Sequence, residues 1–232
     1  MPDVFDGAKK TLGEWAASQI PHGIRLGIGS GSTVSAFIEA LGERNKREPL
    51  GLTVAAASKA SEMMVRGQGI TVVPLETLTS LDLAVDGADK VDLSGVLIKG
   101  GGAALVRERL IIAASERTLI LVDKGKLMNT FHQVSIPVAM IPYGWRQTLS
   151  RLSRLSGGAS LRTLLTGPVV TDDGLYVADV KVDAIPDPEA WHRRFKMVEG
   201  VVDTGLFAGY ATEVWVSDGT RTQPYRIPGA IL

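Results

Sequence analysis

The first half of the chain alternates short apolar runs with amphipathic stretches. The apolar runs have the length of buried strands, and they cover residues 24–28, 52–57, 70–73, 81–85, 96–98 and 118–122. Between them, apolar residues recur at helical spacing, as Val34, Phe37 and Leu41 do on one helix face. An earlier helix has Asp3 as its predicted cap and ends before Pro21. Strands that alternate with helices predict a parallel, doubly wound α/β sheet.

From about residue 130 the order of elements changes. Strand, helix, strand, strand, helix and strand are predicted at 134–141, 145–155, 161–165, 169–181, 188–198 and 201–204, and the strand at 169–181 is expected to contain a turn at 172–174. Pro137 is expected to interrupt the first strand, and Asp187 to cap the second helix. This β-α-β-β-α-β order is that of a ferredoxin-like unit. We therefore predict a first domain from residues 1–129 and 205–232, and a second, smaller domain at 130–204.

Composition excludes several classes of protein. The 232 residues are 45% apolar and 22% charged, as in an ordinary globular protein. Basic and acidic residues are equal in number, 25 each, so no basic face for nucleic acid is expected. There is no cysteine, which excludes disulfides and thiolate nucleophiles. The first residues do not resemble a signal peptide, and no apolar run is long enough for a membrane helix, so a cytoplasmic protein is expected.

The three histidines, His22, His132 and His192, lie far apart in the sequence. No two of them have the spacing of ligands on one helix face. A metal site of carboxylates alone is the alternative, and we expect no metal site.

The stretch from Asp86 to Glu108 carries most of the candidate chemistry. The predicted strand 81–85 ends at Asp86, and the predicted strand 96–98 ends at Lys99. Open α/β sheets bind ligands at the carboxyl ends of their strands. Gly100, Gly101 and Gly102 then allow backbone N–H groups to approach an anion closely, just before a helix begins.

Each of these features also has a purely structural interpretation. Asp86 and Asp89 suit a turn, Lys99 a solvated strand end, and Glu108 an exposed helix face. A turn, however, does not need this many charges and glycines at two strand ends. We therefore interpret the stretch as a binding or catalytic site.

A second glycine-rich stretch, Gly27 to Thr33, follows the first predicted strand and opens a helix. It lacks the Gly-Lys-Ser/Thr ending of a Walker loop and the later third glycine of a dinucleotide fingerprint. Ser30, Ser32 and Thr33 add hydroxyl groups that can donate to phosphate oxygens. A tight turn with a serine cap is the alternative, and the density of hydroxyls favours an anion site.

Four motifs together resemble the type A family of ribose-5-phosphate isomerases: GSGST at 29–33, DGAD at 86–89, KGGGAALVRE at 99–108 and VDKGK at 122–126. Their order and spacing match, and the two-domain outline covers nearly the whole chain. The resemblance implies a Rossmann-like parallel-sheet domain with an inserted, smaller α+β (ferredoxin-like) domain. It also implies interconversion of D-ribose 5-phosphate and D-ribulose 5-phosphate without metal or cofactor, and we expect a homodimer or homotetramer.

The resemblance assigns roles to individual residues. Glu108 falls on the proton-transferring base, Asp86 and Asp89 on two loop carboxylates, and Lys99 on the site lysine. The implied substrate-binding residues are Ser30, Gly31, Ser32, Thr33, Asp86, Gly87, Ala88, Asp89, Lys99, Gly100, Gly101, Gly102 and Lys126. Asp86 is the candidate for opening the sugar ring. Lys90 departs from the family pattern, which usually has an acid there.

Two other classes of function compete with this interpretation. A sugar-phosphate-sensing regulatory module of the same fold would keep the phosphate loop, lose the base and need a DNA-binding segment. An acyl-coenzyme A transferase or amino-sugar deaminase of related fold would not need KGGGAAL beside DGAD. Neither terminus offers a basic helix-turn-helix, and both motifs are present, so the isomerase is favoured.

Overall fold

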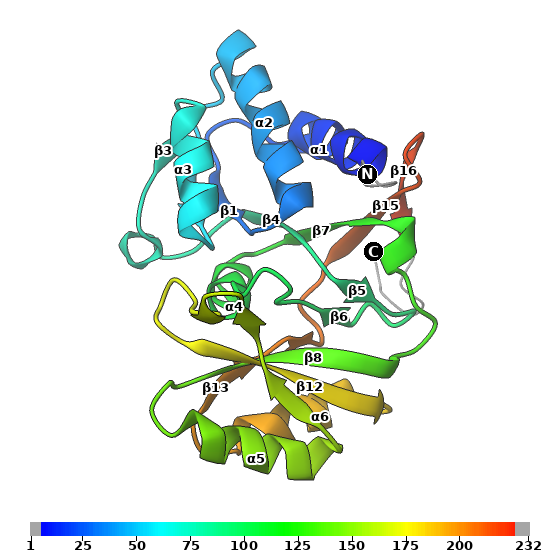
Figure 1. The fold of residues 1–232 in the computed structure, drawn as a ribbon. Coiled ribbons are helices and arrows are strands. Elements are labelled where there is room, and N and C mark those ends of the chain that lie inside the picture. The colour runs from blue at the N-terminus through cyan, green and yellow to red at the C-terminus, as the bar shows by residue number, and fades with distance from the viewer. Residues whose placement is uncertain (1–5, 226–232) are drawn as a thin grey trace. The chain divides into compact units, whose positions relative to one another are not determined.

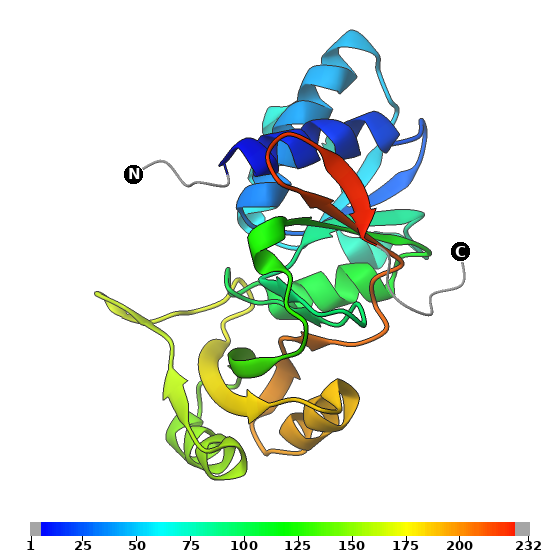
Figure 2. The same cartoon turned by 90° about the vertical axis from the view of Figure 1, so that its right-hand side faces the viewer.

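The computed structural model describes residues 6–225, which divide into two compact units (Figures 1 and 2). Unit 1 takes in the residues up to Ala88, Arg107–Leu127 and those from Tyr210 onward. Unit 2 takes in Asp89–Val106 and Met128–Gly209. This division groups residues 89–106, 128–129 and 205–209 with the second unit, whereas the sequence pattern placed them in the first domain. The predicted cap Asp3 lies outside the described residues.

Unit 1 contains a seven-stranded sheet in the order β16-β15-β7-β4-β1-β2-β3. Its strands are β1 (Arg25–Ile28), β2 (Thr53–Ala56), β3 (Thr71–Val72), β4 (Leu83–Gly87), β7 (Thr118–Asp123), β15 (Glu213–Ser217) and β16 (Thr222–Tyr225). Neighbouring strands are parallel except for β15 and β16, which are antiparallel. The predicted parallel sheet is therefore confirmed, with an antiparallel edge strand that the sequence pattern did not indicate.

The helices of unit 1 begin where apolar periodicity begins. Those that lie wholly within unit 1 are α1 (Asp6–Gln19), α2 (Ser32–Arg47) and α3 (Lys59–Gly67), with 3₁₀ turns at Leu75–Thr77 and Lys124–Lys126. These three helices lie together over one face of the sheet (Figure 1). Phe37 and Leu41 of α2 are fully buried in a core that includes Leu26 of β1. Burial of this apolar face, more than helix propensity, stabilises such helices.

The strand order reverses direction between β1 and β4. From β1 the chain proceeds to β2 and β3 on one side, and from β4 it proceeds to β7 on the other. The crevice at the carboxyl ends of two such strands is where open α/β sheets bind ligands. A ligand is therefore expected to bind at the loop that follows β1 and at the residues that end β4.

The amino ends of β1 and β4 are joined by Arg25 and Asp82. The Arg25 backbone N–H and Nε donate to Asp82 Oδ2 at 2.6 and 3.2 Å, and the Arg25 Nη2 donates to Asp82 Oδ1. These hydrogen bonds with Arg25 hold the pKa of the Asp82 carboxyl below its ordinary value. The pair thus helps to keep β1 and β4 in register away from the ligand-binding end.

Unit 2 contains an antiparallel sheet in the order β13-β8-β12-β9. The elements, in chain order, are β8 (His132–Met140), α5 (Trp145–Ser156), β9 (Ala159–Leu161), β12 (Tyr176–Ala184), α6 (Pro188–Lys196) and β13 (Val201–Thr204). This is the predicted ferredoxin-like β-α-β-β-α-β arrangement. Phe131 and Phe195 are fully buried in its core, and Asp187 caps α6 by accepting from the Ala190 N–H at 2.9 Å.

Two predicted strands of unit 2 were wrong in their bounds. The run 161–165 splits after β9. In the run 169–181 the predicted turn at 172–174 is present, and Val170 before it forms an isolated antiparallel bridge with Tyr176, but the strand β12 begins only at Tyr176. Between them lies a small hairpin of β10 (Thr163–Leu164) and β11 (Gly167–Pro168). The apolar pattern does not distinguish one long strand from two short ones. The bounds of these strands are set instead by the backbone pairing of the hairpin.

The expected break of β8 at Pro137 was also wrong, because the strand runs through it. Pro137 pairs with Asp179 of β12, and its carbonyl accepts from the Gly205 N–H at 2.6 Å. In an antiparallel strand the carbonyl and N–H of a residue point to the same side. The side of Pro137 that lacks an N–H therefore faces β13. The pairing of β13 with β8 has already ended at Thr204, so no hydrogen bond of the sheet is lost at Pro137.

A third sheet, of three short antiparallel strands, corrects the expected position of Lys99. It has the order β14-β6-β5, formed by β14 (Leu206–Phe207), β6 (Leu97–Ile98) and β5 (Lys90–Val91). Thus β6 is not a strand of the parallel sheet, and Lys99 does not lie at the carboxyl end of a parallel strand. The helix α4 (Leu105–Ala113) follows, and the division between the two units falls within it.

Candidate active site

The backbones of β1 and β4 meet at Gly29 and Asp86 in unit 1. The Gly29 N–H donates to the Val85 carbonyl at 2.9 Å, which places Gly29 directly against the Asp86 side chain. A Cβ at Gly29 would lie 1.9 Å from Asp86 Cγ, so only glycine fits there. Asp86 is fully buried, and its Oδ1 accepts from the Gly87 N–H at 2.7 Å and the Ser30 N–H at 3.3 Å. These bonds hold the carboxylate at the carboxyl ends of β1 and β4.

A second carboxylate joins this cluster through Ser30. The Ser30 hydroxyl donates to Glu108 Oε1 at 2.7 Å, although the two residues are 78 positions apart. Glu108 lies in the first turn of α4, and only 4% of it is exposed. A carboxylate near a helix N-terminus is stabilised by the helix dipole. Ser30, Asp86 and Glu108 thus form one hydrogen-bonded group within unit 1.

The loop that leads into α2 has the features of an anion site. Gly31 has a φ of +94°, which favours glycine, and α2 begins at Ser32. Thr33 is 3% exposed, and its hydroxyl makes no hydrogen bond with any residue between 6 and 225. Buried hydroxyls in native proteins nearly always have a partner. The Thr33 hydroxyl therefore keeps its hydrogen-bonding capacity for a group outside residues 6–225.

Lys126 lies in the 3₁₀ turn after β7 in the same unit. Its Nζ is 3.9 Å from Asp123 Oδ2, and Asp123 is buried. The Asp123 carboxylate also accepts from the Gly125 N–H at 3.0 Å, which stabilises this turn. The turn therefore presents a lysine at the carboxyl end of another parallel strand.

Ala88 is buried at the end of the first segment of unit 1, and the remaining predicted residues belong to unit 2. Asp89 Oδ2 accepts from the Gly101 N–H at 2.7 Å, so the carboxylate fixes the triple-glycine loop. Lys99 is buried, with 2% exposed, and its Nζ lies 5.9 Å from the centre of the Phe207 ring. This distance is within the range of a cation–π contact. Gly100 has a φ of +104°, which the turn into α4 requires.

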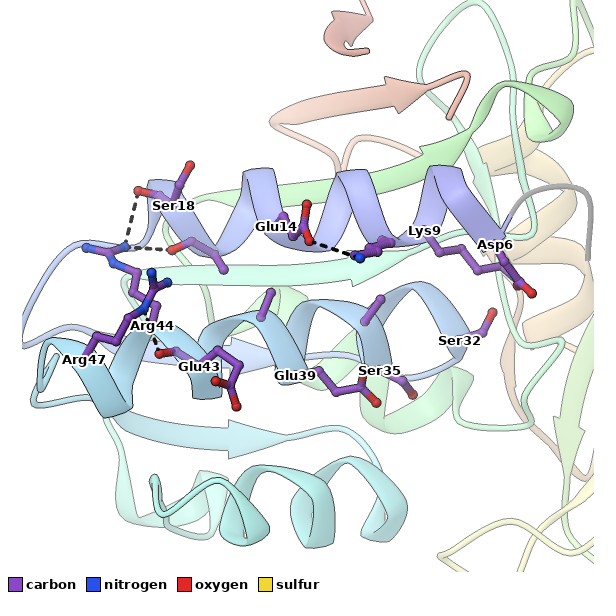
Figure 3. Close-up of a pocket in the computed structure, with 14 residues that line it drawn as sticks. Asp6, Lys9, Glu14, Ser18, Ser32, Ser35, Glu39, Glu43, Arg44 and Arg47 are labelled. Atoms are coloured by element: carbon purple, nitrogen blue, oxygen red, sulfur yellow. Dashed lines mark hydrogen bonds and ion pairs between the residues drawn. The ribbon is translucent and has the colours of Figure 1, made fainter. Parts of the chain in front are cut away.

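A groove of about 660 Å³ runs between α1 and α2 (Figure 3). Charged side chains line it, and Lys9 pairs with Asp6 at 3.4 Å. Arg44 Nη1 donates to the Ala17 carbonyl at 2.7 Å, so its charge joins the two helices. Among the predicted site residues, Ser32 alone lines the groove. Lys9, at the same end of the groove (Figure 3), was not singled out from the sequence, because helical spacing does not show where α1 crosses α2.

Two further findings concern metal binding and membrane insertion. Between residues 6 and 225, no group of three or more His, Cys, Asp or Glu side chains is arranged to hold a metal ion. In that same part of the chain, no helix is long and apolar enough to cross a membrane.

Residues 53–221 match the family model for ribose 5-phosphate isomerase A (phosphoriboisomerase A). The chain belongs to this family. It is 38% identical over 213 residues to ribose-5-phosphate isomerase A 1 of Oceanobacillus iheyensis, covering 92% of this chain and 95% of the relative. It is 40% identical over 226 residues to ribose-5-phosphate isomerase A of a Synechococcus species, covering 94% of each chain.

Solved structures of isomerases with this name have the same fold. The ribose 5-phosphate isomerase A of Methanocaldococcus jannaschii superposes with a TM-score of 0.88 at 30% identity, over 95% of this chain and 99% of that one. A D-ribose-5-phosphate isomerase in complex with phospho-erythronic acid gives a TM-score of 0.88 at 32% identity, over 94% and 96%. The predicted fold class and the predicted family are therefore confirmed.

Proposed function

We propose that this chain interconverts D-ribose 5-phosphate and D-ribulose 5-phosphate through an enediolate, in the non-oxidative branch of the pentose phosphate pathway. The observation that carries the proposal is the buried Glu108 carboxylate, bonded to Ser30 at the reversal point of the sheet, in a chain of the ribose 5-phosphate isomerase A family. A module that only binds sugar phosphates would not need a second buried carboxylate beside Asp86.

In this mechanism Glu108 acts as the base. It removes the proton from carbon 2 of the open aldose and returns it to carbon 1, while a second proton moves from oxygen 2 to oxygen 1. Substrate and product therefore have the same composition, and one carboxylate on one face of the sugar is sufficient. The hydrogen bond from Ser30 fixes the orientation of the carboxylate before the reaction begins.

The other predicted residues act around that step. Asp86, fixed by two backbone N–H groups, opens the sugar ring. Lys99 and the N–H groups of the triple-glycine loop stabilise the negative charge of the enediolate, and Asp89 holds that loop. The chain joins Asp86 to Asp89 through only two residues, which keeps their Cα atoms within about 11 Å of each other.

The phosphate is proposed to bind at residues 30–33, assisted by Lys126. Ser32→Ala combined with Thr33→Ala should raise KM about tenfold or more and lower kcat much less, because hydrogen bonds to a charged group are lost equally in ground and transition states. Initial rates over a range of ribose 5-phosphate concentrations measure both constants. Ser150→Ala, an exposed hydroxyl in α5, is the control. An unchanged KM in the double variant would place the phosphate elsewhere.

Turnover should not depend on a metal ion, because a lysine and backbone N–H groups supply the charge stabilisation in this mechanism. Dialysis against a chelator should leave the rate of ribulose 5-phosphate formation unchanged. Loss of the rate, with recovery on addition of zinc, manganese or magnesium, would contradict the mechanism. This assay also tests the proposed function itself, because a regulatory module would show no turnover at any metal concentration.

Two further proposals concern the oligomeric state of the protein and its location in the cell. We expect a cytoplasmic homodimer or homotetramer, by resemblance to the family. Size-exclusion chromatography with light scattering measures the mass of the assembly, and a monomer at micromolar concentration would contradict the expectation.

A further inference from the structure

Arg162 contacts the triple-glycine loop from a distant part of unit 2. It lies between β9 and β10, and its Nη1 donates to the Gly100 carbonyl at 2.7 Å and the Gly101 carbonyl at 3.0 Å. Neither the sequence motifs nor the mechanism above includes this residue. A single guanidinium nitrogen thus bonds two successive carbonyls of the loop that is proposed to stabilise the enediolate.

The guanidinium is itself held in place by Asp179 of β12. Arg162 Nε donates to Asp179 Oδ2 at 2.9 Å, and Nη2 donates to Oδ1 at 2.5 Å, a bidentate pair. The Arg162 side chain is 18% exposed. Its backbone N–H donates to the Val177 carbonyl at 2.8 Å. Arg162 therefore reaches the loop from a rigid sheet with few alternative conformations.

The loop is held on both of its sides. Asp89 accepts the Gly101 N–H, while Arg162 bonds the carbonyls of Gly100 and Gly101. Each peptide carbonyl is conjugated with the N–H of the following residue. A cation at the two carbonyls draws electron density from the peptide units, which strengthens the hydrogen bond from the Gly101 N–H to Asp89 and makes the Gly102 N–H a stronger donor toward the enediolate.

We propose that Arg162 is a positioning residue of the isomerase, which orients and polarises the triple-glycine loop so that its N–H groups stabilise the enediolate. The inference rests on the proposed function. It assigns Arg162 an effect on the transition state, with little effect on binding of the phosphate.

The test compares Arg162→Met, Arg162→Lys and the double variant Arg162→Met with Asp179→Asn. We expect Arg162→Met to lower kcat at least about tenfold with KM within about threefold, and Arg162→Lys to fall between it and wild type. Inhibition by phospho-erythronic acid, whose carboxylate stands in place of the reacting carbons, should weaken by a similar factor. Inhibition by inorganic phosphate should not change. Arg154→Met, an exposed arginine of α5, is the control.

The double variant separates this role from a structural one, because it removes the carboxylate that Arg162→Met leaves without its partner. A kcat that stays low in the double variant supports the proposal. Recovery of wild-type kcat there would overturn it, as would wild-type kcat in Arg162→Met or equal weakening of both inhibitors. If wild type itself fails to isomerise ribose 5-phosphate, the proposed function is wrong, whereas wild-type turnover with an unaffected Arg162→Met removes this inference alone.

Discussion

Glu108→Gln is expected to lower kcat for ribose 5-phosphate at least about a hundredfold, the lower end for loss of a general base. Glutamine has the size of glutamate and can still accept the hydrogen bond from Ser30, but it cannot take a proton from carbon 2. KM and the thermal midpoint should remain near those of wild type. Release of deuterium from carbon 2 of labelled substrate, followed by NMR, should be measurable for wild type and nearly absent for the variant.

Glu116→Gln is the matched control, because Glu116 is exposed and lies three residues beyond the end of α4. It should leave kcat and the exchange of deuterium unchanged. Near wild-type turnover in Glu108→Gln would remove Glu108 from the mechanism and leave Asp86 as the next candidate for the base.

Gly29→Ala is expected to lower both activity and stability. The new Cβ would lie 1.9 Å from Asp86 Cγ, and the backbone at Gly29 cannot easily retreat. Its N–H is bonded to the Val85 carbonyl, and its carbonyl accepts from the Ser61 hydroxyl at 2.7 Å. Asp86 must therefore move, and a displacement of about 1 Å in a catalytic group can cost on the order of a hundredfold in rate. Overpacking of this kind destabilises proteins by about 1–3 kcal/mol.

Thermal unfolding and initial-rate kinetics test this prediction. Gly67→Ala is the control, because a Cβ there meets nothing within 4 Å and Gly67 ends a helix with no positive φ. Adding Asp86→Ala to Gly29→Ala should restore part of the lost stability, since the clash is removed, without restoring activity. Wild-type kinetics in Gly29→Ala would show that the position of Asp86 is not critical.

The local pattern was sufficient for the strands that carry the site. The apolar runs at 24–28, 81–85 and 118–122 correspond to β1, β4 and β7, and Asp86 lies at the carboxyl end of its strand as predicted. Buried parallel strands produce continuous apolar runs, and these are the clearest strand signal in a sequence. The glycines and hydroxyls after β1 likewise indicated the loop before α2.

The apolar pattern did not show which sheet the short strands belong to. The two-residue strand β6 has no periodicity that could assign it to one sheet or another, and it pairs with β5 and β14 in a small antiparallel sheet. The expectation that Lys99 ends a parallel strand was wrong for this reason. Pro137 lies within β8 because its missing N–H faces the side where the ladder has ended, which depends on where β13 stops.

Motifs and apolar periodicity within single segments were enough to predict the family, the fold class and the residue types at the site. Which residues meet became clear only in the folded chain: Ser30 with Glu108, Gly29 against Asp86, and Arg162 with the triple-glycine loop. These contacts join segments 56 to 78 residues apart. Their geometry depends on strand order, register and turn length together, and no local pattern of side chains specifies all three.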